Sequence, residues 1–187
     1  MRLSALLAVL LSTSAGAAVG QQPIPDGAVQ EGQLSFDGSA TTGNFVGTTT
    51  TLSGALVGAA DLAGVRGWVE APVATLKTGN NRRDRDLNKS MESDKYPVLR
   101  FDLDRVEPGD GTPDSLAATL VGRFTLHGVT REASVPAVLS FEPGGVRVRG
   151  SVPLNLKHYE IGGLSKMLGI LKMHEDIVVH VDVRFSY

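Results

Sequence analysis

Apolar and polar residues alternate with a period of two along much of the chain. The clearest run covers residues 116–126, and the same alternation recurs at 99–104, 135–141, 146–154 and 179–187. Successive side chains of a strand point to opposite faces, so each run predicts a strand with one buried and one solvated face. The pattern therefore predicts a mostly β protein.

One face of these strands carries the residues that are expected to form a shared interior. These residues are apolar or small, whereas the opposite parity carries threonine, arginine, aspartate and histidine. The inward set consists of Leu99, Phe101, Ala118, Leu120, Phe124, Leu126, Val135, Ala137, Leu139, Phe141, Val148, Val179 and Val181. Trp68 shares its parity with Arg66 and Glu70, which places it on the outer face or at a rim.

The dipeptide His127-Gly128 interrupts the alternation between two of these strands. Glycine adopts the positive φ that a tight turn or bulge requires, so we expect a hairpin corner with His127 at the rim. Direct contact between His127 and a ligand is the alternative. Two further Pro/Gly connections between antiparallel strands are predicted at 107–115 and 142–145.

Two segments depart from the strand pattern. Leu87 and Met91 are four residues apart among charged residues, which predicts a short amphipathic helix that ends before Pro97. The apolar spacing in 159–176 predicts a partly helical flap that its glycines weaken. With glycine-rich strands in the N-terminal half, the expected architecture is an antiparallel barrel or sandwich with one or two small helical caps.

The first residues have the pattern of a secretory signal peptide. Arg2 is followed by the apolar stretch 3–11 and by the small residues 15–17. We expect residues 1–20 to be the signal peptide, 21–28 a mobile lead-in and 29–187 a single domain. The apolar stretch is too short for a bilayer anchor, so the protein is expected to be exported, either periplasmic or secreted.

Composition excludes several kinds of chemistry. The chain has no cysteine, which excludes thiol catalysis, cysteine-bound metals and iron–sulfur clusters. The net charge of −2, from 18 basic and 20 acidic residues, gives no basic excess for nucleic acid. Four histidines are present without a zinc spacing, and no nucleophile elbow, P-loop or dinucleotide fingerprint occurs. We therefore expect no catalytic residue, no metal site and no cofactor.

Three ordered pieces of the chain resemble a known family. They are TLKTGNNRRDRDL at 75–87, KYPVLRF at 95–101 and GRFTLHGVTREASVPA at 122–137. Over about residues 65–187 the chain is similar to the YceI-like, polyisoprenoid-binding exported proteins. This resemblance implies an eight-stranded antiparallel, lipocalin-like barrel that holds a polyisoprenoid or similar long apolar chain in its lumen, for transport, storage or sequestration.

The resemblance also assigns expected ligand contacts. The inward residues named above, together with Leu164 and Leu168, would line the lumen. Small inward residues and an aromatic content of 5% leave space inside a barrel that is just wide enough for one slim ligand. Arg83, Asp84 and His127 would lie at the mouth and hold a polar head group, since a guanidinium binds phosphate or carboxylate well. Alternatively, Arg83 and Asp84 only fix the helix start, through a cap and a salt bridge, with Asp84 favoured at the helix N-terminus.

Two other classes of function stay open. An enzyme acting on an isoprenoid lipid, such as a hydrolase or isomerase, would need His127 beside a carboxylate in a cleft. A ligand-free structural or interaction module would have a lumen filled by its own side chains. The sequence predicts no membrane span and leaves the oligomeric state open, with a homodimer among the arrangements considered.

Overall fold

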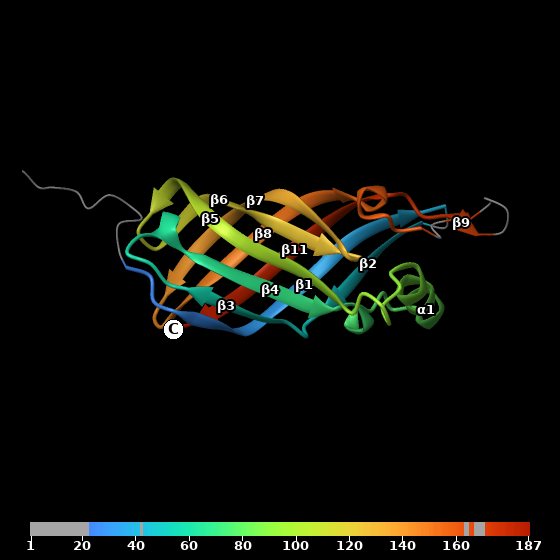
Figure 1. The fold of residues 1–187 in the computed structure, drawn as a ribbon, viewed down its shortest axis with the longest axis horizontal. Coiled ribbons are helices and arrows are strands. Elements are labelled where there is room, and N and C mark those ends of the chain that lie inside the picture. The colour runs from blue at the N-terminus through green and yellow to red at the C-terminus, as the bar shows by residue number, and fades with distance from the viewer. Residues whose placement is uncertain (1–22, 42, 163–164, 167–170) are drawn as a thin grey trace, which may run out of the picture.

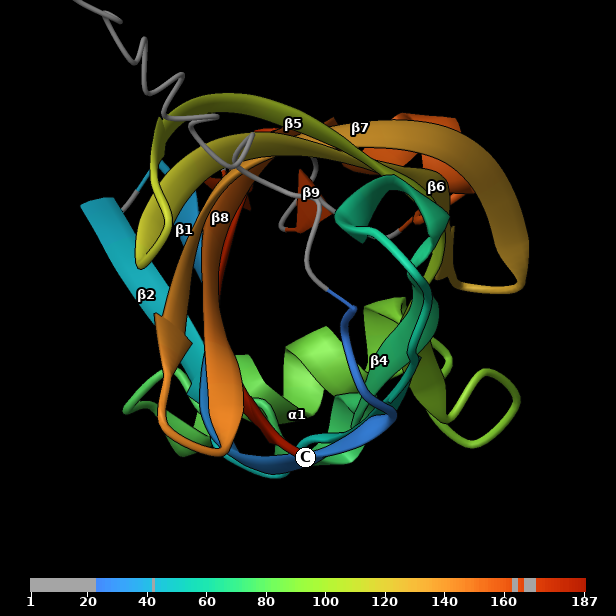
Figure 2. The ribbon, with the colours of Figure 1, turned by 90° about the vertical axis from the view of Figure 1, so that its left-hand side faces the viewer.

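The strands wind around a common axis and enclose a lumen (Figures 1 and 2). The computed structural model describes residues 23–41, 43–162, 165–166 and 171–187. In chain order the strands are β1 (Gly27–Ala40), β2 (Gly43–Thr49), β3 (Ser53–Val57), β4 (Arg66–Pro72), β5 (Val98–Thr112), β6 (Ser115–Leu126), β7 (Val129–Glu142), β8 (Gly145–Asn155), β9 (Ser165–Lys166), β10 (Leu171–Lys172) and β11 (Asp176–Ser186). The helices are α1 (Asn81–Ser90) and the short 3-10 turns η1 (Leu62–Gly64), η2 (Val73–Thr75) and η3 (Leu156–Tyr159).

Antiparallel pairing closes the sheet into a barrel. The order of neighbours is β11-β8-β7-β6-β5-β4-β3-β1, and β1 returns to pair with β11. β2 pairs with β1 over Leu34–Ala40, whereas β3 pairs with β1 only at Gly27 and Ala28. This arrangement confirms the predicted closed barrel of eight antiparallel strands. Among the described residues, no helix has the length and apolar character of a membrane span.

Helix α1 caps one end of the barrel (Figure 1). Asn80 begins it, because its side-chain oxygen accepts hydrogen bonds from the backbone N–H groups of Arg82 and Arg83. The helix ends before Pro97, as predicted. The second predicted helical segment is different: Ser165–Lys166 pairs with Leu171–Lys172 as a small antiparallel ribbon. Leu164 and Leu168 lie outside the described residues.

The predicted turn at 107–115 is shorter than expected. β5 continues to Thr112, and only two residues separate it from β6. The pairing of β5 with β6 shifts in register between Pro108 and Gly111. This irregularity accommodates the proline and the glycines within β5, so these residues do not end the strand. At the other end of the sequence, β1 begins at Gly27, and the backbone of Ile24 pairs with that of Ala59.

The lumen contains two apolar clusters that follow each other along the barrel axis. β6 contributes Leu116, Ala118 and Leu120 to one cluster and Phe124 and Leu126 to the other. The predicted inward residues are all buried or partly buried, which confirms the shared interior. Alternation therefore placed side chains on the correct face of the sheet.

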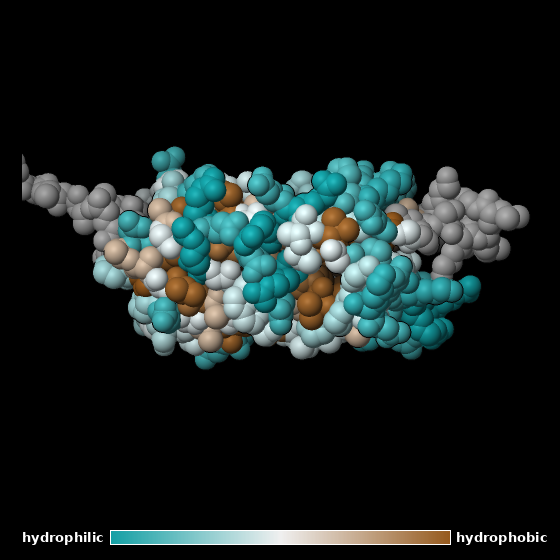
Figure 3. All heavy atoms as spheres, in the orientation of Figure 1, coloured by the Kyte–Doolittle hydropathy of each residue, from teal (hydrophilic) through white to brown (hydrophobic). Residues whose placement is uncertain are grey.

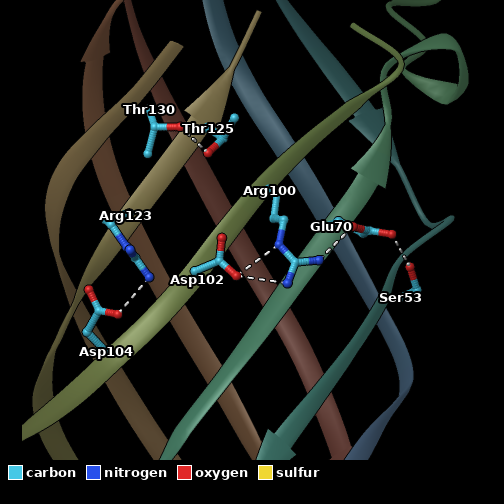
Figure 4. Close-up of polar contacts among 8 residues, drawn as sticks. All are labelled: Ser53, Glu70, Arg100, Asp102, Asp104, Arg123, Thr125 and Thr130. Atoms are coloured by element: carbon cyan, nitrogen blue, oxygen red, sulfur yellow. Dashed lines mark hydrogen bonds and ion pairs between the residues drawn. The ribbon is translucent and has the colours of Figure 1, made fainter. Parts of the chain in front are cut away.

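The outer face carries charge pairs that run across neighbouring strands (Figure 4). Arg100 of β5 lies 2.9 Å from Glu70 of β4 and 2.8 Å from Asp102, and its guanidinium stacks 4.4 Å above the ring of Trp68. Trp68 therefore faces outward. Figure 3 shows a surface of mainly hydrophilic side chains with scattered apolar patches.

The His127-Gly128 corner is a two-residue hairpin loop. Leu126 pairs with Val129, and the loop residues have positive φ angles of 53° and 76°. Positive φ at both positions defines the type I′ turn that fits the twist of a β hairpin. The glycine also lies against Tyr96, because an added Cβ would be 2.4 Å from an atom of that ring.

This geometry gives a matched pair of substitutions. Gly144 also has a positive φ of 73°, but an added Cβ there would meet nothing within 4 Å. We expect Gly144→Ala to lower the free energy of unfolding by about 1 kcal/mol through backbone strain, and Gly128→Ala to lower it by about 2 kcal/mol or more. Denaturant unfolding measures both values. Equal losses would mean that contact with Tyr96 contributes nothing.

Candidate ligand cavity

A cavity of about 360 Å³ occupies the α1 end of the lumen. Its volume falls within the range of about 300–1,000 Å³ that is typical of small-molecule sites. The apolar part of its wall comes from all around the barrel and from the cap: Leu34, Phe36, Phe45, Leu76, Leu87, Met91, Leu99, Phe124, Leu126, Leu154, Leu156, Ile161, Met173, Ile177 and Val179. Aliphatic side chains dominate this wall, so it suits a hydrocarbon ligand.

Three side chains mark the level at mid-barrel where the two apolar clusters meet. Leu52, Phe101 and Val152 are packed against both apolar clusters and therefore lie at the boundary between them. Beyond this boundary lie the buried side chains of the second cluster, and none of them is among the described lining residues of the cavity. The cavity therefore lies on the α1 side of the boundary.

Polar residues gather at the mouth of the pocket. Asn80, Arg82, Arg83, Asp86 and Ser90 come from the start and inner side of α1. The same helix places Leu87 against the apolar cluster, and Met91 follows one turn later. The predicted amphipathic helix therefore forms the boundary between the apolar interior and the charged rim.

Arg83 is among the residues that line the pocket. Its guanidinium is 4.2 Å from the ring centroid of Phe45, and Phe45 meets Phe36 edge-on at 6.1 Å. Both phenylalanines line the pocket. The arginine is held over the aromatic wall by this cation–π contact, with its charge at the entrance.

Asp84 has a structural position away from the pocket. It is buried, and its Oδ1 accepts hydrogen bonds from the backbone N–H of Thr78 at 2.9 Å and from the Thr78 hydroxyl at 2.6 Å. The hydrogen bond from the Thr78 hydroxyl holds the pKa of Asp84 below its usual value. This geometry matches the alternative in which Asp84 fixes the start of the helix, although hydrogen bonds replace the expected salt bridge.

His127 lies at the predicted hairpin corner, but its side chain is buried and not exposed at the rim. Tyr96 covers its ring at a centroid distance of 4.6 Å, and its Nδ1 lies 3.1 Å from the carbonyl oxygen of Tyr159. Its Nε2 lies 3.6 Å from Oε1 of Glu92. The histidine and the carboxylate do meet, but neither belongs to the described lining of the pocket.

The predicted lumen residues divide between the two halves of the barrel. Leu99, Phe124, Leu126 and Val179 line the pocket. Ala118, Leu120, Val135, Ala137, Leu139 and Val148 belong to the packed cluster at the other end, and Phe101, Phe141 and Val181 pack against that cluster. Strand alternation identifies the inward face but carries no information about position along the barrel axis.

Several pocket residues were not predicted. Leu34 and Phe36 alternate with Gln33 and Ser35, so the same period of two would have found them. Arg82 had no such indication, since its place at the mouth depends on how α1 lies across the barrel. Among the described residues, no group of three histidine, aspartate or glutamate side chains is placed to hold a metal ion.

The fold and the pocket define a class of protein: a closed antiparallel β-barrel with an apolar internal cavity under a helical cap. The profile of the YceI-like domain matches residues 28–185, and the chain belongs to this family. No curated protein sequence matches the chain significantly.

Solved structures with the same fold share little sequence with the chain. A polyisoprenoid-binding domain from Saccharophagus degradans, described as implicated in plant cell wall breakdown, is 14% identical with a TM-score of 0.72, over 86% of this chain and 97% of that one. BcnA from Burkholderia cenocepacia is 15% identical with a TM-score of 0.70, over 82% and 95%. A Campylobacter jejuni YceI protein is 16% identical with a TM-score of 0.52, over 65% and 72%.

The buried Asp84–Thr78 contact gives a pH-dependent prediction. Asp84→Ala is expected to lower the free energy of unfolding by about 1–3 kcal/mol at pH 7, because the donors of Thr78 lose their acceptor. The pKa of Asp84 is lowered in the folded protein, so this stabilisation is present above the unfolded pKa and is lost as pH falls through the folded pKa. The difference between wild type and variant should shrink in acid.

Asp94→Ala is the control, because Asp94 is an exposed residue with no side-chain partner among the described residues. Urea unfolding between pH 7 and pH 3 measures both variants. A loss for Asp84→Ala that does not change with pH would exclude a contribution from the carboxylate charge.

Proposed function

We propose that the protein binds one isoprenoid or comparable lipid chain in the pocket under α1. The observation that carries this proposal is an apolar cavity of about 360 Å³ enclosed by a barrel wall that is otherwise tightly packed. The description of the Saccharophagus degradans protein as a polyisoprenoid-binding domain supports the same class of ligand.

The hydrophobic effect is sufficient for such binding. Each Å² of apolar surface removed from water contributes about 25 cal/mol, so a branched hydrocarbon in this pocket needs few polar contacts. The wall offers both aliphatic and aromatic side chains, such as Leu126, Ile177 and Phe124. A flexible chain adapts to this mixed surface better than a rigid polar ligand does.

The position of the second apolar cluster determines how the ligand lies. Its buried side chains lie beyond the pocket, so the chain is expected to enter from the α1 end and to keep its other end there. A chain longer than the pocket would leave its remainder outside the barrel.

Binding for transport, storage or sequestration fits the pocket better than catalysis. No histidine is among its described lining residues, and the His127–Glu92 pair lies outside it. The protein is therefore proposed to act as a lipid carrier, without a cofactor.

The packing difference between the two halves of the lumen gives a direct test. Val179→Phe adds a ring at the pocket wall, and we expect it to reduce lipid binding by at least about tenfold while the melting temperature stays near that of wild type. Ala137→Phe adds a similar ring in the packed half, where overpacking should cost about 1–3 kcal/mol of stability. Displacement of a fluorescent apolar probe and thermal unfolding measure the two effects.

The two variants serve as controls for each other. Native mass spectrometry of the purified wild type would identify a retained lipid. A wild type that binds no apolar chain, together with an early-melting Val179→Phe, would contradict the carrier and leave a structural module.

Export is proposed from the leader pattern of residues 1–20. The mature chain is expected to begin near residue 18 or 21. N-terminal sequencing of protein from the native source measures this directly. Retention of Met1 would contradict export.

A further inference from the structure

The outer wall of the barrel carries a serine, a histidine and an aspartate that are connected by hydrogen bonds. Ser151 Oγ lies 2.7 Å from Nδ1 of His180, and Nε2 of the same ring lies 3.0 Å from Oδ2 of Asp37. β8, β11 and β1 each contribute one member. No local motif in the sequence indicates this group, because the serine and the aspartate are 29 and 143 residues away from the histidine.

Strand register holds the three side chains together. Ser151 is directly opposite His180 in the ladder of β8 and β11. Asp37 follows by two positions Ser35, which is opposite His180 in the ladder of β1 and β11. Opposite residues point to the same face of a sheet, and so do residues two apart on one strand. The seam that closes the barrel therefore places the imidazole between the hydroxyl and the carboxylate.

The two hydrogen bonds fix the direction in which a proton can move. A carboxylate only accepts hydrogen bonds, so the neutral imidazole carries its proton on Nε2 and donates a hydrogen bond to Asp37. Its Nδ1 then accepts from the hydroxyl of Ser151. This order, from hydroxyl to imidazole to carboxylate, activates a serine nucleophile, and it is recognised by geometry and roles, whatever the order along the chain.

Apolar side chains lie beside this group on the same face. Val46 of β2 and Val178 of β11 are both opposite Asp37, and Pro153 of β8 is opposite Val178. Val46 is 50% exposed. Ser151 is exposed too, and it is not among the described residues that line the lumen cavity. A reactant therefore meets the serine on an open wall beside a small apolar surface, and it has to bring a good leaving group of its own.

We propose that Ser151 is a nucleophilic site for activated acyl groups, with His180 as its general base and Asp37 as the positioning residue. The site is independent of lipid binding in the lumen. With an aryl ester, Oγ of Ser151 bonds to the carbonyl carbon while its proton passes to Nδ1 of His180. The bond from that carbon to the aryloxy oxygen breaks, and the aryloxide takes the proton and leaves as a phenol.

Water completes the cycle. It attacks the acyl carbon and loses a proton to Nδ1 of His180, and this proton returns to Oγ of Ser151 as the acyl–Oγ bond breaks. A carboxylic acid is released and the serine is restored. No oxidant, metal or cofactor takes part in either step.

The test uses p-nitrophenyl acetate and an alkyl fluorophosphonate with the folded full chain. The fluorophosphonate forms an Oγ–P bond as its P–F bond breaks, and peptide mass spectrometry then identifies the labelled serine. Ser53 is the internal reference, because its exposed hydroxyl bonds directly to Glu70 at 3.4 Å with no imidazole between them (Figure 4). We expect Ser151 to be labelled at least about tenfold faster than Ser53, the low end of general-base assistance, since the group is exposed.

Four variants assign the roles. Ser151→Ala should remove this label and the release of p-nitrophenol that depends on it. His180→Gln keeps hydrogen-bonding capacity but cannot take up the proton, so labelling of Ser151 should slow at least about tenfold. Asp37→Asn should slow it similarly, because an amide that donates to Nε2 moves the ring proton to Nδ1. Ser53→Ala is the matched control and should leave the labelling rate of Ser151 unchanged. Melting temperatures near that of wild type show that the sheet is intact.

Labelling of wild type in urea gives a test that does not depend on any variant folding. Once the three strands separate, Ser151 and Ser53 should react at the same rate. A folded wild type in which Ser151 reacts no faster than Ser53 would overturn the proposal and leave a structural hydrogen-bond network across the seam. Fast labelling of Ser151 that persists in folded His180→Gln and Asp37→Asn would overturn the roles of the histidine and the aspartate.

Discussion

The hydrogen-bonded ladder between β1 and β11 is the constraint on which the rest of the structure depends. It joins the first long strand of the domain to the last one, from Ala28 opposite Ser186 to Asp37 opposite Val178. Closure removes the sheet edges along this seam and commits the inward side chains to a common lumen. Because the closed barrel has a fixed internal volume, the sizes of these side chains determine which part of the lumen is packed and which part stays open.

Side chains fill the two ends of the lumen to different extents. At one end, small and medium residues such as Ala118, Ala137 and Val148 interdigitate with Phe185 and Leu116 and leave a packed core. At the other end, the wall is no less apolar, but the space is capped by α1 and not filled by side chains. The lumen of a barrel of this size can hold either its own side chains or one slim ligand. In this barrel one half of the lumen is packed with side chains and the other half contains a cavity, and the two halves meet at the level of Phe101.

The sequence specified local features more fully than global ones. Period-two alternation predicts the inward faces, the spacing of Leu87 and Met91 predicts α1, and His127-Gly128 predicts a tight corner, because each depends on neighbouring residues. Position along the axis depends instead on strand stagger across the whole barrel, so alternation could not separate Ala137 from Leu126. The burial of His127 depends on Tyr96, which arrives from a different loop.

Around the α1 end of the barrel, several polar groups stabilise the surrounding structure. Asp84 secures the segment before α1 through Thr78, Asn80 begins the helix, and His127 joins the β6–β7 corner to the carbonyl of Tyr159. These groups are committed to partners within the protein, so they have little capacity left for a ligand. Arg82 and Arg83 line the pocket close by, and neither has a carboxylate within ion-pair distance among the described residues. This separation between groups that fix the rim and side chains without such partners supports the proposed binding site at this end of the barrel.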